Sequence, residues 1–104
     1  MTPADLPNLW ANARKRYPQH AARIDRAQAI LHNHFDDPAR RLIMVLAGPD
    51  GLTLRVKSQA GQHGYHVTAR GCTCPDWPRS HRCKHYIAGA VFSKLLGFVL
   101  GGAS

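Results

Sequence analysis

The sequence contains no glutamate, so its six acidic residues are all aspartates. This absence excludes the His-x-Glu and His-Glu-x-x-His motifs of deaminases and metalloproteases, in which glutamate is the general acid or base. The aspartates face 14 lysines and arginines, which gives a formal net charge of +8 on 104 residues. An excess of this size favours an anionic partner such as nucleic acid, with a solvated basic face as the alternative.

Long hydrophobic runs are also missing. Residues 86–100 form an apolar stretch that is shorter than the roughly 20 residues of a membrane helix, and Lys94 interrupts it. The first ten residues, MTPADLPNLW, have neither a basic start nor an apolar run, so we expect no secretory signal. Three cysteines, an odd number, do not suggest a disulfide framework. These features together predict a cytoplasmic protein without a membrane partner.

Two N-terminal segments place apolar residues at helical spacing. The first predicts a helix over residues 5–17 that ends before Pro18, with a stripe of Leu6, Leu9, Trp10, Ala13 and Tyr17. The second predicts a helix over residues 19–35, with a stripe of Ile24, Ala27, Ile30, Leu31 and Phe35. Arg23 and Arg26 are expected on its outward side.

The period then changes to that of β-strands. Residues 41–47, 52–58 and 64–70 are rich in β-branched and apolar residues, and turn sequences separate them. They predict a three-stranded antiparallel meander in which Val56 lies opposite Tyr65 or Val67. The second helix is the expected cover for one face, and the other face would present basic residues to water. A final helix is expected over residues 83–99, where Gly89 and Ala90 would allow close approach to the sheet.

Three cysteines and a histidine lie together in GCTCPDWPRSHRCKHYIAG, residues 71–89. The spacing is Cys72-x-Cys74, eight residues, then Cys83-x-His85. Three thiolates and one imidazole are a standard ligand set for structural zinc. Cys72 and Cys74 are expected to point the same way as the chain leaves the third strand. Cys83 would precede the final helix and His85 would lie in its first turn, because two residues deep inside a helix turn about 200° apart.

Other interpretations of the cluster remain open. In one alternative, the cysteines are buried free thiols that bind no metal. In another, His81 is the fourth ligand in place of His85. With four protein ligands the zinc has no open position for water. A turn that Asp76 caps explains this residue as well as a catalytic role would. We therefore expect no enzymatic activity and no small-molecule substrate.

The predicted fold class is α+β, with N-terminal helices, the three-stranded sheet, a zinc-knuckle loop and the C-terminal helix.

The motif Cys72-Thr-Cys74-Pro-Asp-Trp, followed by Cys83-Lys-His85 and an apolar helix, resembles the SWIM zinc finger, whose signature is Cys-x-Cys, a variable gap and Cys-x-His. The resemblance covers roughly residues 23–96 and is strongest over 71–89. It implies that these three cysteines and His85 bind one zinc ion, and that residues 19–100 form the zinc-binding domain behind a helical extension, 1–18. SWIM modules occur in transposases, helicase-like ATPases, recombination factors and ubiquitin-pathway proteins, and are credited with binding DNA or proteins. This chain carries no accompanying ATPase, nuclease or ligase part, so the resemblance implies no activity.

The basic residues near the motif are the expected contacts for nucleic acid, DNA first. Some lie around the loop and others on the outer face of the sheet: Arg79, Arg82 and Lys84, with Arg55, Lys57 and Arg70. Trp77 either stacks on an unpaired base or packs over the finger and its helix. A different class of function is also open. In it the chain is an adaptor whose final or N-terminal helix docks on a larger recombination, repair, transposition or regulatory protein.

Overall fold

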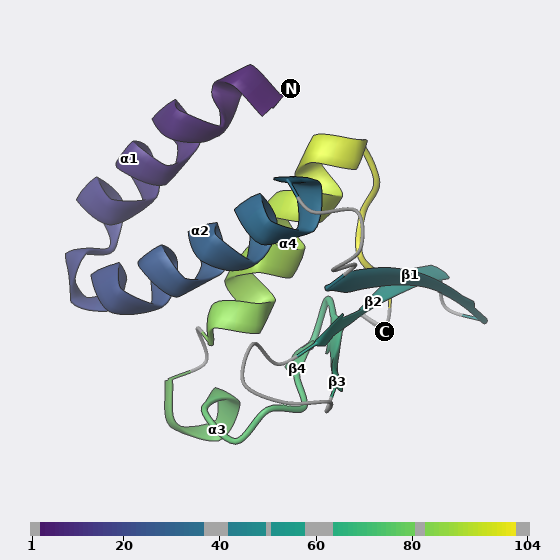
Figure 1. The fold of residues 1–104 in the computed structure, drawn as a ribbon. Coiled ribbons are helices and arrows are strands. Elements are labelled where there is room, and N and C mark those ends of the chain that lie inside the picture. The colour runs from purple at the N-terminus through teal and green to yellow at the C-terminus, as the bar shows by residue number, and fades with distance from the viewer. Residues whose placement is uncertain (1–2, 37–41, 50, 58–63, 81–82, 102–104) are drawn as a thin grey trace.

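The structure is a computed structural model, and it describes residues 3–36, 42–49, 51–57, 64–80 and 83–101. It contains helices and a single antiparallel sheet (Figure 1), which confirms the α+β class. The elements in chain order are η1 (Pro3–Asp5), α1 (Leu6–Arg16), η2 (Pro18–His20), α2 (Ala21–Asp36), β1 (Ile43–Gly48), β2 (Gly51–Lys57), β3 (Gly64–Thr68), β4 (Gly71–Cys72), α3 (Trp77–Ser80) and α4 (Lys84–Leu96).

The two N-terminal helices form as their apolar stripes predict. Each is preceded by a short 3₁₀ turn that begins at a proline, Pro3 or Pro18, because proline lacks the amide hydrogen that an interior helical position would use. The stripe residues that become buried are Leu6 and Trp10 of α1 and Ile24, Ala27, Ile30 and Leu31 of α2. Phe35, at the end of the second stripe, is 43% exposed.

The sheet has four strands in the order β1-β2-β3-β4, one more than predicted. Val56 lies opposite Tyr65, one of the two partners that the alternation of apolar residues allowed. The third strand ends at Thr68 instead of continuing to Arg70, because the chain reverses and pairs Gly71 and Cys72 with β3. Gly71 has a φ of 146°, a conformation that other residues rarely adopt. Cys72 therefore lies within a short strand rather than beyond the sheet.

The second helix does not cover most of the sheet as expected: it contacts β1, where the Ile43 amide donates to Nδ1 of His34. α4 packs against β2, β3 and β4, and α2 packs on the other side of α4 (Figure 1). α2 has apolar residues on one stripe only, whereas α4 buries residues on several sides, as a helix enclosed between two layers requires. Gly89 allows the contact, since a Cβ atom there would lie 3.0 Å from Cγ1 of Val67 and 3.2 Å from Cδ1 of Leu54.

The C-terminal helix ends three residues before the predicted position. Gly97 adopts a left-handed conformation with φ 80° and caps α4, as glycine commonly does at this position. The chain then turns back to the sheet, where the Gly101 amide donates to the carbonyl of Leu52 and the Gly101 carbonyl accepts from the amide of Ala69. Leu100 is consequently buried against the core.

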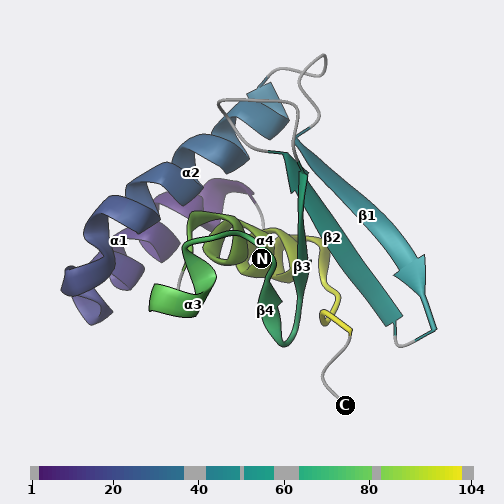
Figure 2. The same cartoon turned by 90° about the horizontal axis from the view of Figure 1, so that it is seen from below.

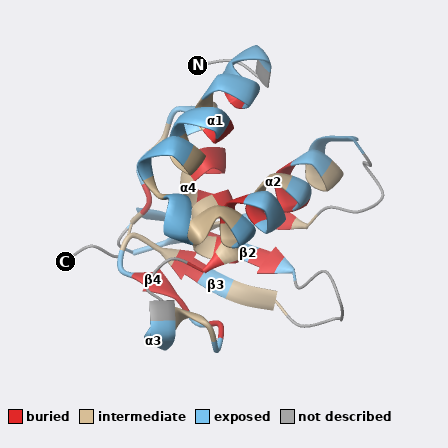
Figure 3. Cartoon of the chain, turned by 90° about the vertical axis from the view of Figure 1, so that its left-hand side faces the viewer, coloured by how far each residue is buried: buried red, intermediate tan, exposed pale blue. Residues whose placement is uncertain are grey.

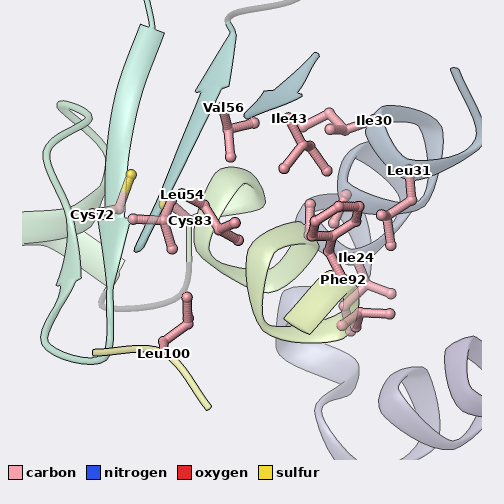
Figure 4. Packing of buried hydrophobic residues seen from close by; sticks show 14 of the residues in the cluster. Ile24, Ile30, Leu31, Ile43, Leu54, Val56, Cys72, Cys83, Phe92 and Leu100 are labelled. Carbon is pink, nitrogen blue, oxygen red and sulfur yellow. The ribbon is translucent and has the colours of Figure 1, made fainter. Parts of the chain in front are cut away.

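The core lies where α2, α4 and the sheet meet. Buried residues gather there, while the outer side of α1 is exposed (Figure 3). Figure 4 shows its side chains, among them Ile24 and Leu31 from α2, Phe92 from α4 and Val56 from β2. Cys72 and Cys83 belong to the same buried cluster. Each helix in the described residues is too short or too polar to cross a bilayer.

Substitution of Gly89 tests the close approach of α4 to the sheet. Gly89→Val should lower the free energy of unfolding by about 2 kcal/mol, because overpacking of a filled site costs roughly 1–3 kcal/mol. Ala90→Val is the matched control, since Ala90 is only half-buried and lines an open hollow. It should cost less than about 1 kcal/mol. Urea unfolding of both variants measures the difference, and equal losses would show that Gly89 is not a contact point.

Candidate metal centre

The four predicted ligands come from β4, from the loop after it and from the start of α4. Cys72 is the second residue of β4, and Cys74 follows two positions later. Cys83 is the N-cap residue of α4, with extended backbone at φ −69° and ψ 159°, and His85 lies in the first helical turn. The helix therefore begins between the two C-terminal ligands, as the spacing predicts. The loop with α3 connects β4 to α4 (Figure 2).

These side chains converge on one point. One sulfur or ring-nitrogen atom from each of the four residues lies within 4.8 Å of all the others. Thiolates at about 2.3 Å from a tetrahedral zinc ion lie about 3.8 Å apart, so the cluster needs only a small contraction to hold one ion. All four residues are buried, with exposed fractions of 8% for Cys72, 3% for Cys74, 0% for Cys83 and 4% for His85.

The imidazole of His85 supports a metal at this point. Among the described residues, neither ring nitrogen of His85 has a hydrogen-bond partner, although both are buried. A buried polar atom without a partner is costly. Coordination of a metal by one ring nitrogen removes that cost for the nitrogen that binds the metal. The ring of Tyr65 lies beside the imidazole, with centroids 4.7 Å apart, and restrains its orientation. The residues present thus fit a metal ion bound by three sulfurs and one nitrogen.

The three thiols differ in their acidity. Hydrogen bonding from the Cys72 thiol lowers the pKa of Cys83 to about 4, against the opposing effect of burial. The start of α4 adds to this effect, because the amide of Tyr86 donates to Sγ of Cys83 at 3.3 Å. The pKa of Cys72 is raised by its hydrogen bond to Cys83 and by burial. Burial also raises the pKa of Cys74. One thiolate and two thiols are therefore expected at neutral pH before a metal binds.

The loop between the cysteine pairs is tied to α2. Nε and Nη2 of Arg23 donate to the Asp76 carboxylate at 2.9 and 3.2 Å. From the sequence we assigned Asp76 to a turn and Arg23 to the solvent side of its helix, so this ion pair was not predicted. The two residues are 53 positions apart, and only the packing of α2 beside the loop brings them together. Asp76 raises the pKa of Arg23, which stays charged.

Trp77 is the first residue of α3 and packs within the loop between the cysteine pairs. Its ring lies 4.8 Å from that of Tyr86 in α4, between centroids. A Cβ atom on Gly71 would collide with the Trp77 indole, so the ring lies directly over the reversal between β3 and β4. The side chain is half-buried. These contacts favour the packing interpretation of Trp77.

The predicted nucleic-acid contacts are distributed over three surface hollows. Arg55 and Lys57 line one of them on β2, and Arg70 lines a second beside Trp77. Arg79 and Lys84 line a third, which adjoins the metal centre. Arg82 and the alternative ligand His81 lie outside the described residues.

Two arginines that the sequence did not assign to a site also line the third hollow. They are Arg23 and Arg26 of α2, three residues apart on one side of the helix. The segment RIDR carries their spacing, but spacing alone does not distinguish a binding face from a solvated one.

No known protein family, curated protein or solved structure matches this chain.

Metal binding should release protons. At pH 7 Cys83 is ionised, whereas the raised pKa values of Cys72 and Cys74 keep both protonated. Since thiolates are the ligands, binding of one ion should displace about two protons if the metal-free cluster is folded and about three if it is unfolded, and affinity should rise with pH. Isothermal titration with zinc in buffers of different ionisation enthalpy measures this number. A value of zero would contradict the assignment of the two thiols as ligands.

Cys74→Ser tests the ligand set by a single change. The variant should lose the metal and unfold in its C-terminal half, because structural zinc supplies about 10–16 kcal/mol of apparent binding energy against a typical stability of about 5–15 kcal/mol. Thr73→Ser is the matched control on the neighbouring exposed residue, and it should keep both metal and fold. Native mass spectrometry and thermal melting provide the measurements. A Cys74→Ser protein with one bound ion and an unchanged melting curve would refute the assignment.

Proposed function

We propose that this chain is a SWIM-type zinc module that binds nucleic acid, DNA first, and catalyses no reaction. The observation that carries the proposal is the buried convergence of Cys72, Cys74, Cys83 and His85. Three thiolates and an imidazole in a tetrahedral arrangement suit zinc better than the hard cations that prefer oxygen ligands. A reducing compartment such as the cytoplasm keeps these thiols available for the metal.

A structural role for the zinc follows from the ligand count. Four protein ligands fill a tetrahedral site, whereas catalytic zinc keeps one position for water or substrate. The ion would bind the end of the sheet to the start of α4, which lies between the sheet and α2. In this proposal the metal organises the fold, and the surface makes the functional contact.

Nucleic acid is the favoured partner because of charge. Zinc with three thiolates and a neutral imidazole carries a net charge of −1, so the metallated protein keeps about +7 from its formal charge of +8. The described basic side chains on the proposed surface are mostly exposed: Arg55, Lys57, Arg70 and Arg79. Contacts of this kind bind phosphates without reading bases and give dissociation constants of about 10⁻⁴–10⁻⁶ M.

DNA binding should be measured by fluorescence anisotropy on the zinc-loaded protein, with duplex and single-stranded oligonucleotides. Neutralisation of four phosphates should weaken binding about 100-fold between about 50 and 200 mM salt, because counterions are released in proportion to the phosphates contacted. Chelation of the metal should abolish binding together with the fold. An absence of binding at micromolar protein and low salt would exclude the proposal.

A second candidate is the adaptor that docks on another protein, and exposed apolar residues favour it. Val99 is 89% exposed and Leu96 is 55% exposed at the end of α4. The edge strand β1 also presents Met44, 55% exposed, and Val45, 41% exposed, and it contains no charged residue or proline. Edge strands of this composition readily pair with other chains.

Replacement of the two α4 residues tests this adaptor surface. If they form a docking surface, the wild type should self-associate as its concentration rises, and Leu96→Ser with Val99→Ser should remain monomeric with a similar melting temperature. Sedimentation velocity compares the two proteins. A wild type that stays monomeric throughout would remove the support for this candidate. Substitution is preferable to truncation, because Leu100 and Gly101 hold the chain end to the sheet.

A further inference from the structure

A hollow of about 370 Å³ opens beside the metal centre. Part of its lining is the cluster itself, with Cys74, Cys83 and His85. Other parts come from α2, from Tyr65 of β3, from Pro75 and Asp76, from α3 and from the start of α4. A water molecule takes about 30 Å³ in the liquid, so the space is ample for an anion the size of a phosphate group.

The remaining charged residues of this hollow are mainly positive. Among its described lining residues, Arg23 and Arg26 enter from α2, Arg79 from α3 and Lys84 from α4, against the one carboxylate of Asp76. Arg26 and Arg79 are exposed and Lys84 is half-buried. Of the ion pairs among described residues, none involves any of these three. Even with a metallated centre of charge −1, the four positive charges exceed the two negative ones.

Such a gathering of like charges is unfavourable without an anion. Three separate elements bring four cations to one hollow, where each repels the others. Lys84 also occupies the first turn of α4, which contains no acidic residue, and a cation there is disfavoured by the helix dipole. An anion in the hollow relieves both effects.

We propose that this hollow binds one phosphate group of the nucleic acid. That the phosphate belongs to a nucleic acid rests on the proposed function. Asp76 holds Nε and Nη2 of Arg23 and so orients its guanidinium. Arg26, Arg79 and Lys84 supply charge-assisted hydrogen bonds to the phosphate oxygens. The phosphate stays outside the metal's coordination sphere, which the four protein ligands fill.

The experiment compares two double variants of equal charge and composition, each checked for one bound zinc and for its melting curve. Arg26→Gln with Lys84→Gln changes the hollow, whereas Lys15→Gln with Arg16→Gln changes exposed residues of α1 that do not line it. Single-stranded DNA with a 5′-phosphate or a 5′-hydroxyl is the first probe, read by anisotropy. Inorganic phosphate is the second, followed by the amide NMR shifts of the zinc-loaded protein.

The hollow variant should bind DNA about 10-fold more weakly, and the slope of its salt dependence should fall by about 1. The α1 variant should stay within about 2-fold of wild type. Arg79→Gln, with Arg16→Gln as its control, repeats the test if Lys84→Gln impairs metal binding. A loss restricted to 5′-phosphorylated DNA assigns the site to a terminal phosphate, and an equal loss on both probes assigns it to the backbone.

Two outcomes separate this inference from the proposed function. DNA binding that weakens equally in the hollow and α1 variants would overturn the phosphate site and leave a diffuse basic surface. Inorganic phosphate that shifts amides around the hollow, in a wild type that binds no DNA, would support the site and overturn the nucleic-acid function. No response to either probe would overturn both.

Discussion

The convergence of three thiols and one imidazole between β4 and α4 is the contact on which the rest of the structure depends. β4 is only two residues long, and paired strands of that length have little stability of their own. α4 begins at the same cluster and then forms the layer between the sheet and α2. A metal ion at this point would therefore fix the position of the helix on which both sides of the core pack.

Contacts with α2 and α4 make the loop between the cysteine pairs part of the whole fold. The ion pair of Arg23 with Asp76 ties the loop to α2, and the Trp77 ring packs on Tyr86 of α4. The loop is thus held from two helices as well as by its own cysteines. The same packing brings α2 arginines to the edge of the metal centre. Structural support and surface charge consequently come from the same helix.

Much of the fold could be predicted because its signals are local. Apolar stripes of helical period predicted α1 and α2. Strict alternation limited the partner of Val56 to Tyr65 or Val67, and the structure has Tyr65. The helix that covers most of the sheet was predicted wrongly, since periodicity shows that a helix has a buried face without showing which surface buries it. The two-residue strand β4 was missed because the reversal depends on the conformation of a single glycine, Gly71.

The sequence by itself determined the chemistry of the candidate centre, because all four candidate ligands lie within 14 consecutive residues and their spacing matches a strand end and a helix start. It also determined the excess of positive charge. Only the tertiary structure decided which charges act together. Arg23 and Asp76 are separated by 53 positions, and such pairs meet through the packing of whole elements, which depends on side-chain shape along complete faces and leaves no short motif in the chain.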